Sequence, residues 1–230
     1  EPLLIGRITL KNAAQTFAYA DYRAALDAQD AGETRGVSVR IEAEAAAKTS
    51  SQMLYPQQDS SSPAVYPSSA KLLLNNAIGG NSWRHAGQWI EWTFTVPKDG
   101  YYNISLYDKQ NFVRGIHVSR RIYIDGSVPF EEFASYPFTY AQSWRLDTLA
   151  DESGEPYAVY LTAGAHTLRM EVVLGDMAQI ISQIQRCVLK LNAIYRQVIY
   201  ITGVSPDKYR DYQIEASLPG LKDELIKVRD

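Results

Sequence analysis

Four residues with recognisable chemistry stand in a short stretch, flanked by glycines, just before the most regular apolar segment. They are Asn81, Trp83, Arg84 and His85. An indole face attracts polarised C–H bonds, and planar amide and guanidinium groups hydrogen-bond to hydroxyls. This set therefore suits a sugar ring, which has an apolar face and a rim of hydroxyls. The alternative is that Trp83 fills the core, the commoner use of tryptophan.

Two further groups could extend such a surface. One stands at a predicted strand end, where the loops of β-sandwiches gather, and consists of Lys109, Gln110, Asn111 and Arg114. The other is Trp144 with Arg145, next to an aromatic run at 136–140. Asn111 and Trp144 are the members that we predict to contact a ligand. The alternatives are that Asn111 caps backbone groups and that Trp144 packs in the core.

Motifs of catalysis do not occur in the sequence. The three histidines lack zinc-ligand spacing, and neither a G-x-S-x-G elbow nor a phosphate-binding loop is present. Asp147, Asp151 and Glu152 could be imagined as a glycosidase pair, but nothing fixes the required carboxylate separation of roughly 5 to 9 Å. The sequence predicts a protein that is not an enzyme.

Composition excludes several other classes. A net charge of −3 and a pI near 5.7 argue against a nucleic-acid partner. The single Cys187 excludes an internal disulfide. No apolar run approaches the ~20 residues that a transmembrane helix needs, and the start at Glu1 lacks a signal-peptide pattern. We interpret the chain as trimmed.

The apolar pattern predicts a mainly β region from residue 36 to 174. Alternation over 90–96 and 102–106, around a turn with Pro97 and Gly100, predicts a central hairpin. Asp125-Gly126 predicts a second hairpin, with a type I′ turn and a return strand at Val128 and Phe130. Further strands are predicted at 37–43, 143–149, 157–162 and 166–173, with a long surface loop at 48–69. Many short strands are typical of an antiparallel sandwich.

Helical sequence flanks this region. Alanine-rich residues 12–29 predict a helix within an N-terminal arm, 1–35. From Asp176 an apolar stripe at helical spacing predicts a long amphipathic helix that ends near Gly203. Ser205-Pro206 and Pro219 each predict a further helix start, and the last segment reaches Asp230 without a terminator. We therefore define 175–230 as a helical extension and expect the native polypeptide to continue.

Several stretches resemble known families. IEAE at 41–44, GQWIEWTFTVPKDGYYNISL at 87–106 and AGAHTLRME at 163–171 resemble jelly-roll carbohydrate-binding modules of the galactose-binding-like type. IGGNSW, KQNFVRG, RRIYIDGSVPFEE and LNAIYRQVIYITGVSPDKYRDY resemble the β-sandwich region of large extracellular solute-binding lipoproteins of Gram-positive bacteria, which serve sugar ABC transporters. The resemblance implies a jelly-roll fold, a cell-surface-anchored location, and as partners carbohydrate, the remaining receptor domains and ABC transporter subunits.

The same resemblance raises the question of calcium. Glu42 and Glu44 match the acidic pair of the modules' first strand, and two carboxylates on one strand face could supply hard oxygen ligands. Calcium usually takes ~6 to 8 oxygens, and the modules' last acidic ligand has no counterpart because helical sequence follows Val173. The alternative is a solvated strand face, so a structural Ca²⁺ is only a hypothesis here.

Three functions are consistent with these observations. The first is a non-catalytic carbohydrate-binding module of an extracellular solute-binding protein for sugar uptake. The second is a structural or docking domain of that receptor without a glycan site, which the apolar stripe of the C-terminal helices favours. The third is an accessory domain of a polysaccharide-degrading enzyme.

Overall fold

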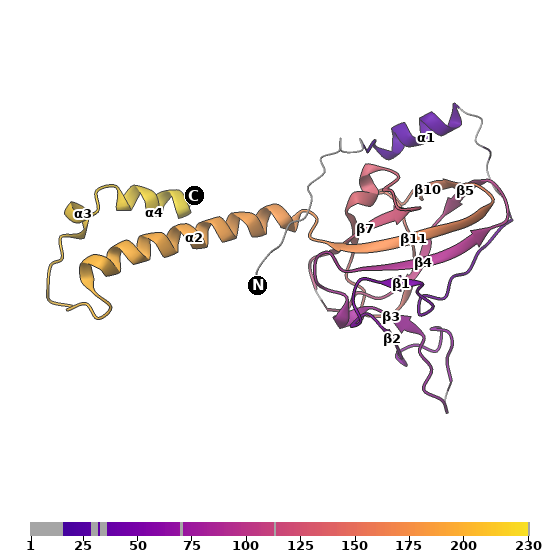
Figure 1. Cartoon of the computed structure of the whole chain (residues 1–230), viewed down its shortest axis with the longest axis horizontal. Helices are drawn as coiled ribbons and strands as arrows, with labels where there is room; N and C mark the ends of the chain where they lie inside the picture. The colour runs from indigo at the N-terminus through magenta and orange to yellow at the C-terminus, as the bar shows by residue number, and fades with distance from the viewer. Residues whose placement is uncertain (1–15, 29–31, 33–35, 70, 113, 230) are drawn as a thin grey trace, which may run out of the picture. The chain divides into compact units, whose positions relative to one another are not determined.

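The computed structural model describes residues 16–28, 32, 36–69, 71–112 and 114–229 (Figure 1). These residues form two compact units, one ending at Gly175 and the other beginning at Asp176. The first unit is mainly β with antiparallel sheets, and the second is helical. The antiparallel β character and the C-terminal helix are thus confirmed, whereas the jelly roll stays a prediction. Residues 12–15 and 29 of the helix predicted at 12–29 lie outside the described residues.

The largest sheet has five strands in the order β1-β4-β11-β7-β8, all antiparallel. They are β1 (Lys48–Thr49), β4 (Trp89–Val96), β7 (Val118–Ile124), β8 (Tyr136–Phe138) and β11 (Gly164–Val173). Ile90 lies opposite Met170, and Trp92 lies opposite Leu168, so the apolar sides of β4 and β11 coincide. The alternation in the sequence therefore identified the core-facing residues of β4 correctly.

The remaining strands form three short antiparallel pairs. These are β5 (Gly100–Asn103) with β10 (Ala158–Leu161), β6 (Ser105–Asp108) with β9 (Arg145–Thr148), and β2 (Pro56–Gln57) with β3 (Ala77–Ile78). Side chains from β10 and from the five-stranded sheet meet in one core. Its largest fully buried members are Phe130, Phe133, Ile90, Ile122, Leu149, Val96 and Val159.

The predicted central hairpin is wrong, although both of its strands exist. β4 pairs with β1 and β11, while β5 pairs with β10. The turn with Pro97 and Gly100 carries the chain from one sheet to another instead of returning it beside β4. Period-2 alternation identifies a strand and its buried face, but it does not identify the partner, which long-range packing selects.

Two other predicted strands do not form. Asp125 (φ 50°) and Gly126 (φ 79°) make the expected tight turn, but pairing stops at a single bridge between Ile124 and Ser127. Phe130 enters the core, and a short 3-10 helix, η2 (Glu131–Ala134), follows. Residues 37–43 are irregular and lead into a turn in which Ala45 N–H donates to the Glu42 carbonyl at 3.0 Å.

Helix α1 (Tyr19–Asp27) lies beside the strand pair β5–β10 (Figure 1). The backbone N–H groups of Ala158 and Tyr160 donate to the hydroxyls of Tyr19 and Tyr22, at 3.0 Å each. These two amides belong to β10, whose strand partner is β5. The tyrosines of α1 therefore satisfy an edge that would otherwise present unpaired backbone groups.

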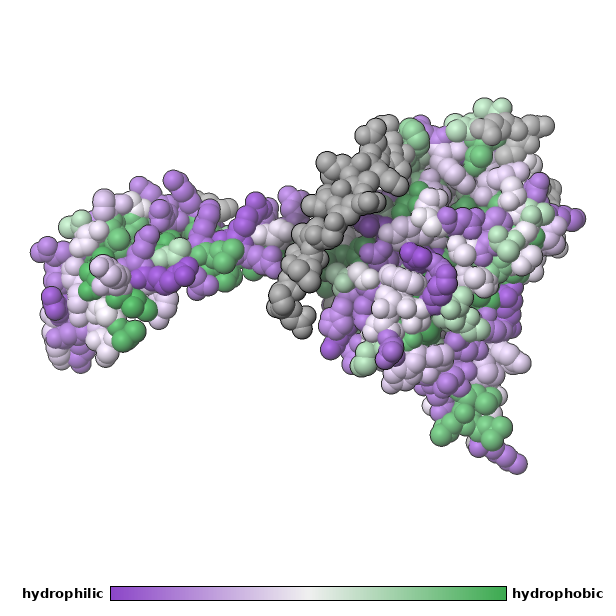
Figure 2. Space-filling model, in the orientation of Figure 1, coloured by the Kyte–Doolittle hydropathy of each residue, from purple (hydrophilic) through white to green (hydrophobic). Residues whose placement is uncertain are grey.

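The C-terminal unit contains α2 (Met177–Thr202), α3 (Ile214–Ser217) and α4 (Leu221–Arg229), and α2 contacts both of the others. Gly203 (φ 72°) ends α2 as predicted, but no helix starts at Ser205-Pro206. Green apolar patches mark this unit in Figure 2. No helix in the described part of the chain combines the length and apolarity of a membrane span.

Candidate functional site

An aromatic pair lies across β6 and β9. Tyr107 lies opposite Leu146 in the ladder, and Trp144 is two residues before Leu146, so both rings are on one face. The rings stack with centroids 5.6 Å apart and planes 14° from parallel. Tyr107 remains 39% exposed, whereas Trp144 is half-buried. The outer ring of this stack is therefore available to a ligand.

Buried polar atoms without partners occur in this pair and in the residues next to it. In residues 16–229, apart from those not described, four buried side-chain nitrogen or oxygen atoms lack a hydrogen-bond partner. Three of them are Asp108 Oδ1, Trp144 Nε1 and Arg145 Nε. Such atoms are rare in folded proteins, and each one indicates a bound water or a functional role. We define Tyr107, Asp108, Lys109, Trp144, Arg145 and Asp59 as the Tyr107–Trp144 cluster.

Opposed charges of β6 and β9 form one side of the cluster. Asp108 and Arg145 are directly opposite in the ladder, with Oδ1 and Nε 3.9 Å apart. Arg145 Nη2 donates instead to Asp147 Oδ2 at 2.8 Å and to Thr139 Oγ1 at 3.0 Å. Burial raises the pKa of Asp108 to about 6, and the negative charge of Asp147 adds to this effect while Arg145 opposes it.

The serine-rich loop predicted at 48–69 supplies the other side. Lys109 pairs with Asp59, and its ammonium lies 5.1 Å from the ring centroid of Trp144. Burial opposes ionisation of Asp59, but hydrogen bonds from Lys109 and Ser61 outweigh it and hold the pKa of Asp59 well below its ordinary value. Lys109 therefore stands over the indole as part of a fixed ion pair.

Asn76 holds this part of the loop in place. Its side-chain oxygen accepts the Asp59 N–H at 2.8 Å, and its amide nitrogen donates to the Asp59 carbonyl at 3.0 Å and the Pro67 carbonyl at 3.1 Å. Asn76 is only 7% exposed. The position of Asp59, and through it that of Lys109, thus depends on a buried amide outside the cluster.

The sequence-predicted residues fall into two groups. Trp144 belongs to the cluster, and Asn111 is exposed three residues after Asp108, in the loop that follows β6. The other four share the turn around η1 (Gly80–Ser82), and among the described residues no hydrogen bond or ring contact joins them to the cluster directly. They are Asn81, Trp83, Arg84 and His85.

Gln88 organises the η1 turn. Its side-chain oxygen accepts the N–H groups of Arg84 at 3.0 Å and His85 at 2.9 Å. Arg84 Nη1 donates to Asn81 Oδ1 at 3.1 Å, and the side chains of Asn81, Arg84 and His85 are exposed. The turn therefore presents polar side chains together, as the sequence predicted.

Trp83 is packed rather than open. It is half-buried against the core, and the Arg120 guanidinium lies 4.3 Å from its ring centroid. A Cβ atom at Gly79 would lie 3.0 Å from the Trp83 ring, so glycine permits this close approach. Much of the Trp83 side chain therefore packs against the core and Arg120, as the alternative interpretation of this tryptophan predicted.

The two predicted metal ligands lie in the 42–45 turn instead of on a strand face. Glu42 pairs with Arg40, with Nε and Oε1 2.7 Å apart. Glu44 is half-buried two residues later. Across the described ranges, no three acidic, histidine or cysteine side chains are grouped to hold a metal ion. The premise that two carboxylates share a strand face is therefore wrong.

Tyr107, Asp108 and Asp59 were not selected from the sequence. Tyr107 and Asp108 continue an alternating strand, which predicts structure and not chemistry. Asp59 is 50 residues from Lys109 in the chain, so only the fold brings the pair together. The aromatic-acidic-basic run at 107–109, directly at a strand end, was the one local signal available.

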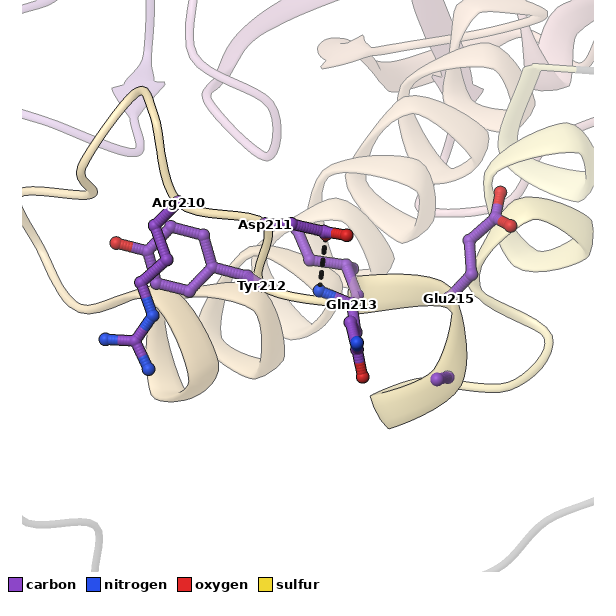
Figure 3. Close-up of a pocket in the computed structure, with 7 residues that line it drawn as sticks. Arg210, Asp211, Tyr212, Gln213 and Glu215 are labelled. Atoms are coloured by element: carbon purple, nitrogen blue, oxygen red, sulfur yellow. Dashed lines mark hydrogen bonds between the residues drawn. The ribbon is translucent and has the colours of Figure 1, made fainter.

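A separate hollow occurs in the helical unit (Figure 3). It is lined by seven consecutive residues, 210–216, where Gln213 has a φ of 47° and donates its N–H to Asp211 Oδ1 at 2.9 Å. Arg210 lies over the Tyr212 ring at 5.1 Å. The hollow is the inside of one bend of the backbone, and we assign no ligand to it.

Comparison with known families matches the C-terminal unit. Residues 179–230 match the model of the bacterial solute-binding protein, 4-helix bundle domain. The matched segment covers α3, α4 and all but the first two residues of α2. This relates the chain to solute-binding proteins. The search of curated protein sequences finds no match.

Solved structures with similarity to the chain include two carbohydrate-active enzymes. A cycloisomaltooligosaccharide glucanotransferase of Paenibacillus sp., complexed with cycloisomaltoheptaose, is 23% identical over 71% of this chain and 22% of its own, with a TM-score of 0.43. A ruminal GH26 endo-β-1,4-mannanase is 18% identical over 61% of this chain and 24% of its own, with a TM-score of 0.35. The chain spans less than a quarter of either structure, and we base no conclusion on these similarities.

Proposed function

We propose that this chain is a non-catalytic carbohydrate-binding module of an extracellular solute-binding protein for ABC-type sugar uptake. The family match of residues 179–230 supports the solute-binding relationship. Under this proposal the five-stranded sheet and the shorter strand pairs form a jelly-roll sandwich. The full-length protein is anchored at the cell surface. Its partners are the other receptor domains and the transporter.

One observation carries the sugar-binding part of the proposal: a stacked, partly exposed aromatic pair has a half-buried ion pair beside it and incompletely bonded polar atoms in and next to it. The open face of Tyr107 would receive the C–H face of a sugar ring. Lys109, whose ammonium lies 5.1 Å from the Trp144 ring centroid, could donate to hydroxyl oxygens, and its partner Asp59 could accept hydroxyl protons. These two side chains are 14 and 21% exposed.

The direct test is a calorimetric titration of the protein with a panel of soluble neutral glycans. A single shallow site should bind in the range of about micromolar to millimolar. We expect Tyr107→Ala to weaken binding by about tenfold or more, because stacking on one ring contributes ~1 kcal/mol beyond its area. Tyr55→Ala, which removes a 61% exposed tyrosine elsewhere in the same unit, is the matched control.

Calcium forms a separate arm of this titration, since Glu42 and Glu44 remain a hypothetical metal site. Glycan binding that both variants retain equally would contradict the assignment to the Tyr107–Trp144 cluster. Failure of the whole panel to bind, with the fold intact by circular dichroism, would favour the second candidate function.

That second candidate is a docking domain without a glycan site. Its support is the exposed apolar stripe of α2, where Ile184, Val188 and Tyr195 are 58, 49 and 62% exposed. Two serines in place of Ile184 and Val188 should then abolish association with the separately expressed remainder of the receptor. Unchanged association would count against docking through α2.

A further inference from the structure

Arg120 carries a charge with no acidic partner among the described residues. It shares the core-facing side of β7 with Ile122 and Ile124. Nη1 donates to the Ser119 carbonyl and Nη2 to the Trp83 carbonyl, at 3.0 Å each, whereas Nε is buried without a partner. Burial lowers the pKa of Arg120 to about 10, and no neighbouring charge offsets this effect.

The two carbonyl bonds do not account for an arginine at this position. A neutral side-chain donor could bond to a carbonyl without the penalty of taking a full charge out of water. Buried charges in proteins are normally paired with an opposite charge, and exceptions concentrate at functional sites. The guanidinium thus has two carbonyls and the Trp83 ring face as neutral partners and no opposite charge in the described part of the chain.

The surroundings of Arg120 are positive and aromatic. The guanidinium lies 4.3 Å from the Trp83 ring centroid, and Arg84 and His85 are exposed on the adjoining turn. Arg84 bonds to the neutral amide of Asn81 and has no ion pair with any carboxylate in the described ranges. Arg120 itself is half-buried, so part of it reaches the surface. Among the described residues no acidic side chain forms an ion pair with Arg120 or Arg84, so an anion could supply the missing opposite charge.

We propose that the Arg120–Trp83 position binds the carboxylate of an acidic monosaccharide such as a uronate. A planar guanidinium matches a carboxylate in geometry and in single charge. The choice of a sugar acid among carboxylates rests on the proposed function, while the requirement for an anion does not. This position is separate from the Tyr107–Trp144 cluster and extends recognition to charged sugars.

The test is calorimetric titration of the whole 230-residue chain, at low salt, with D-galacturonate, D-galactose, acetate and inorganic phosphate. We expect galacturonate to bind at least tenfold more tightly than the other three, with an affinity that falls as salt is added. Equal binding of galactose to the Tyr107→Ala variant, in which the neutral-glycan site is removed, would overturn the requirement for an anion. Equal or tighter binding of acetate or phosphate would overturn the assignment to a sugar acid.

Variants connect the binding to Arg120. Arg120→Met should weaken galacturonate binding about tenfold or more, because a charge-assisted bond is lost. Arg121→Gln is the matched control, since this neighbour lies on the opposite face of β7 and donates to the Ala134 carbonyl at 3.2 Å. An intact Arg120→Met protein with unchanged affinity would overturn the proposal.

Two further variants keep the outcome decisive. If Arg120→Met does not fold, the exposed Arg84→Gln should still weaken galacturonate binding by about two- to fivefold, and no change there would count against the site. Tyr107→Ala should leave galacturonate binding unchanged while it weakens binding of neutral glycans by about tenfold or more. Failure of one site is thus distinguished from failure of the other.

Discussion

Asp108 and Arg145 lie directly opposite each other on β6 and β9, yet they do not form a hydrogen bond. Their nearest charged atoms are 3.9 Å apart, and both Asp108 Oδ1 and Arg145 Nε are buried without partners. A well-made pair would bring these atoms to about 2.8 Å. The arrangement is therefore poor for stability and is the kind of defect that functional sites retain.

Replacing this carboxylate should stabilise the fold. The pKa of Asp108 is raised from its ordinary 3.8 to about 6, so the folded state binds the proton more tightly than the unfolded state. The free energy of unfolding should therefore fall as pH rises from about 4 to 6. Asp108→Asn removes this pH dependence, and at pH 7 we expect a gain of about 1 kcal/mol after allowance for solvent screening. Urea unfolding at several pH values measures it.

Asp108→Asn should also weaken glycan binding, because it removes a charge from the Tyr107–Trp144 cluster. Glu152→Gln removes one negative charge from an exposed turn and serves as the control for net charge. A loss of stability at pH 7 in Asp108→Asn would contradict our interpretation of this carboxylate.

Removing the amide of Asn76 should loosen the serine-rich loop. Three hydrogen bonds to the backbone of Asp59 and Pro67 would be lost from a buried position. At ~1 kcal/mol each, we expect Asn76→Ala to lower the free energy of unfolding by about 3 kcal/mol. The exposed neighbour Asn75 provides the control, and equal effects of Asn75→Ala and Asn76→Ala in urea unfolding would refute this account.

His166 should make stability depend on pH above neutrality. Its Nδ1 lies 2.6 Å from Asp125 Oδ2 and its Nε2 lies 2.7 Å from the Thr162 carbonyl, so both ring nitrogens face acceptors. Burial opposes protonation, but these two acceptors outweigh it and raise the pKa of His166 above its ordinary 6.5. The stabilisation is complete below about pH 6.5 and is lost as pH rises through the raised pKa.

Asp125→Asn tests this prediction, since asparagine tolerates the positive φ of the turn but carries no charge. The decline in the free energy of unfolding above pH 6.5 should become shallower in this variant. His85→Gln, at an exposed histidine, should keep the wild-type slope. Parallel slopes for the wild type and Asp125→Asn would show that the ion pair does not cause the dependence.

Local patterns predicted the elements of this chain better than their partners. The alternation at 90–96, the Asp125-Gly126 turn and the helix ending at Gly203 are all present. The pairing of β4 with β11, about 75 residues later, has no local signature, and so the central hairpin was wrong. The strand predicted at 37–43 failed for a related reason, because alternation alone does not supply a pairing partner.

The candidate site was predictable only in part. Trp144 and Asn111 were selected because aromatic and amide groups at strand ends suit sugars. Tyr107 and Asp108 continue an alternating strand, so the sequence predicted only a structural role for them. Asp59 and Lys109 are far apart in the sequence, and only the fold brings them into contact. The η1 turn was correctly predicted to group its four residues, but the face of Trp83 that Arg120 covers depends on a strand 37 residues away.

The most direct test of the account follows the four indole N–H resonances in an ¹⁵N-labelled protein during titration with a glycan that binds. Trp144 Nε1 makes no full hydrogen bond but lies close enough to the Asp59 carboxylate to help lower the pKa of that group, whereas Trp92 Nε1 donates to the Ala43 carbonyl at 2.8 Å in the core. We predict that the Trp144 signal, assigned with Trp144→Phe, shifts with ligand while the Trp92 signal stays fixed. A glycan that saturates the protein without moving the Trp144 signal would contradict sugar binding at the Tyr107–Trp144 cluster.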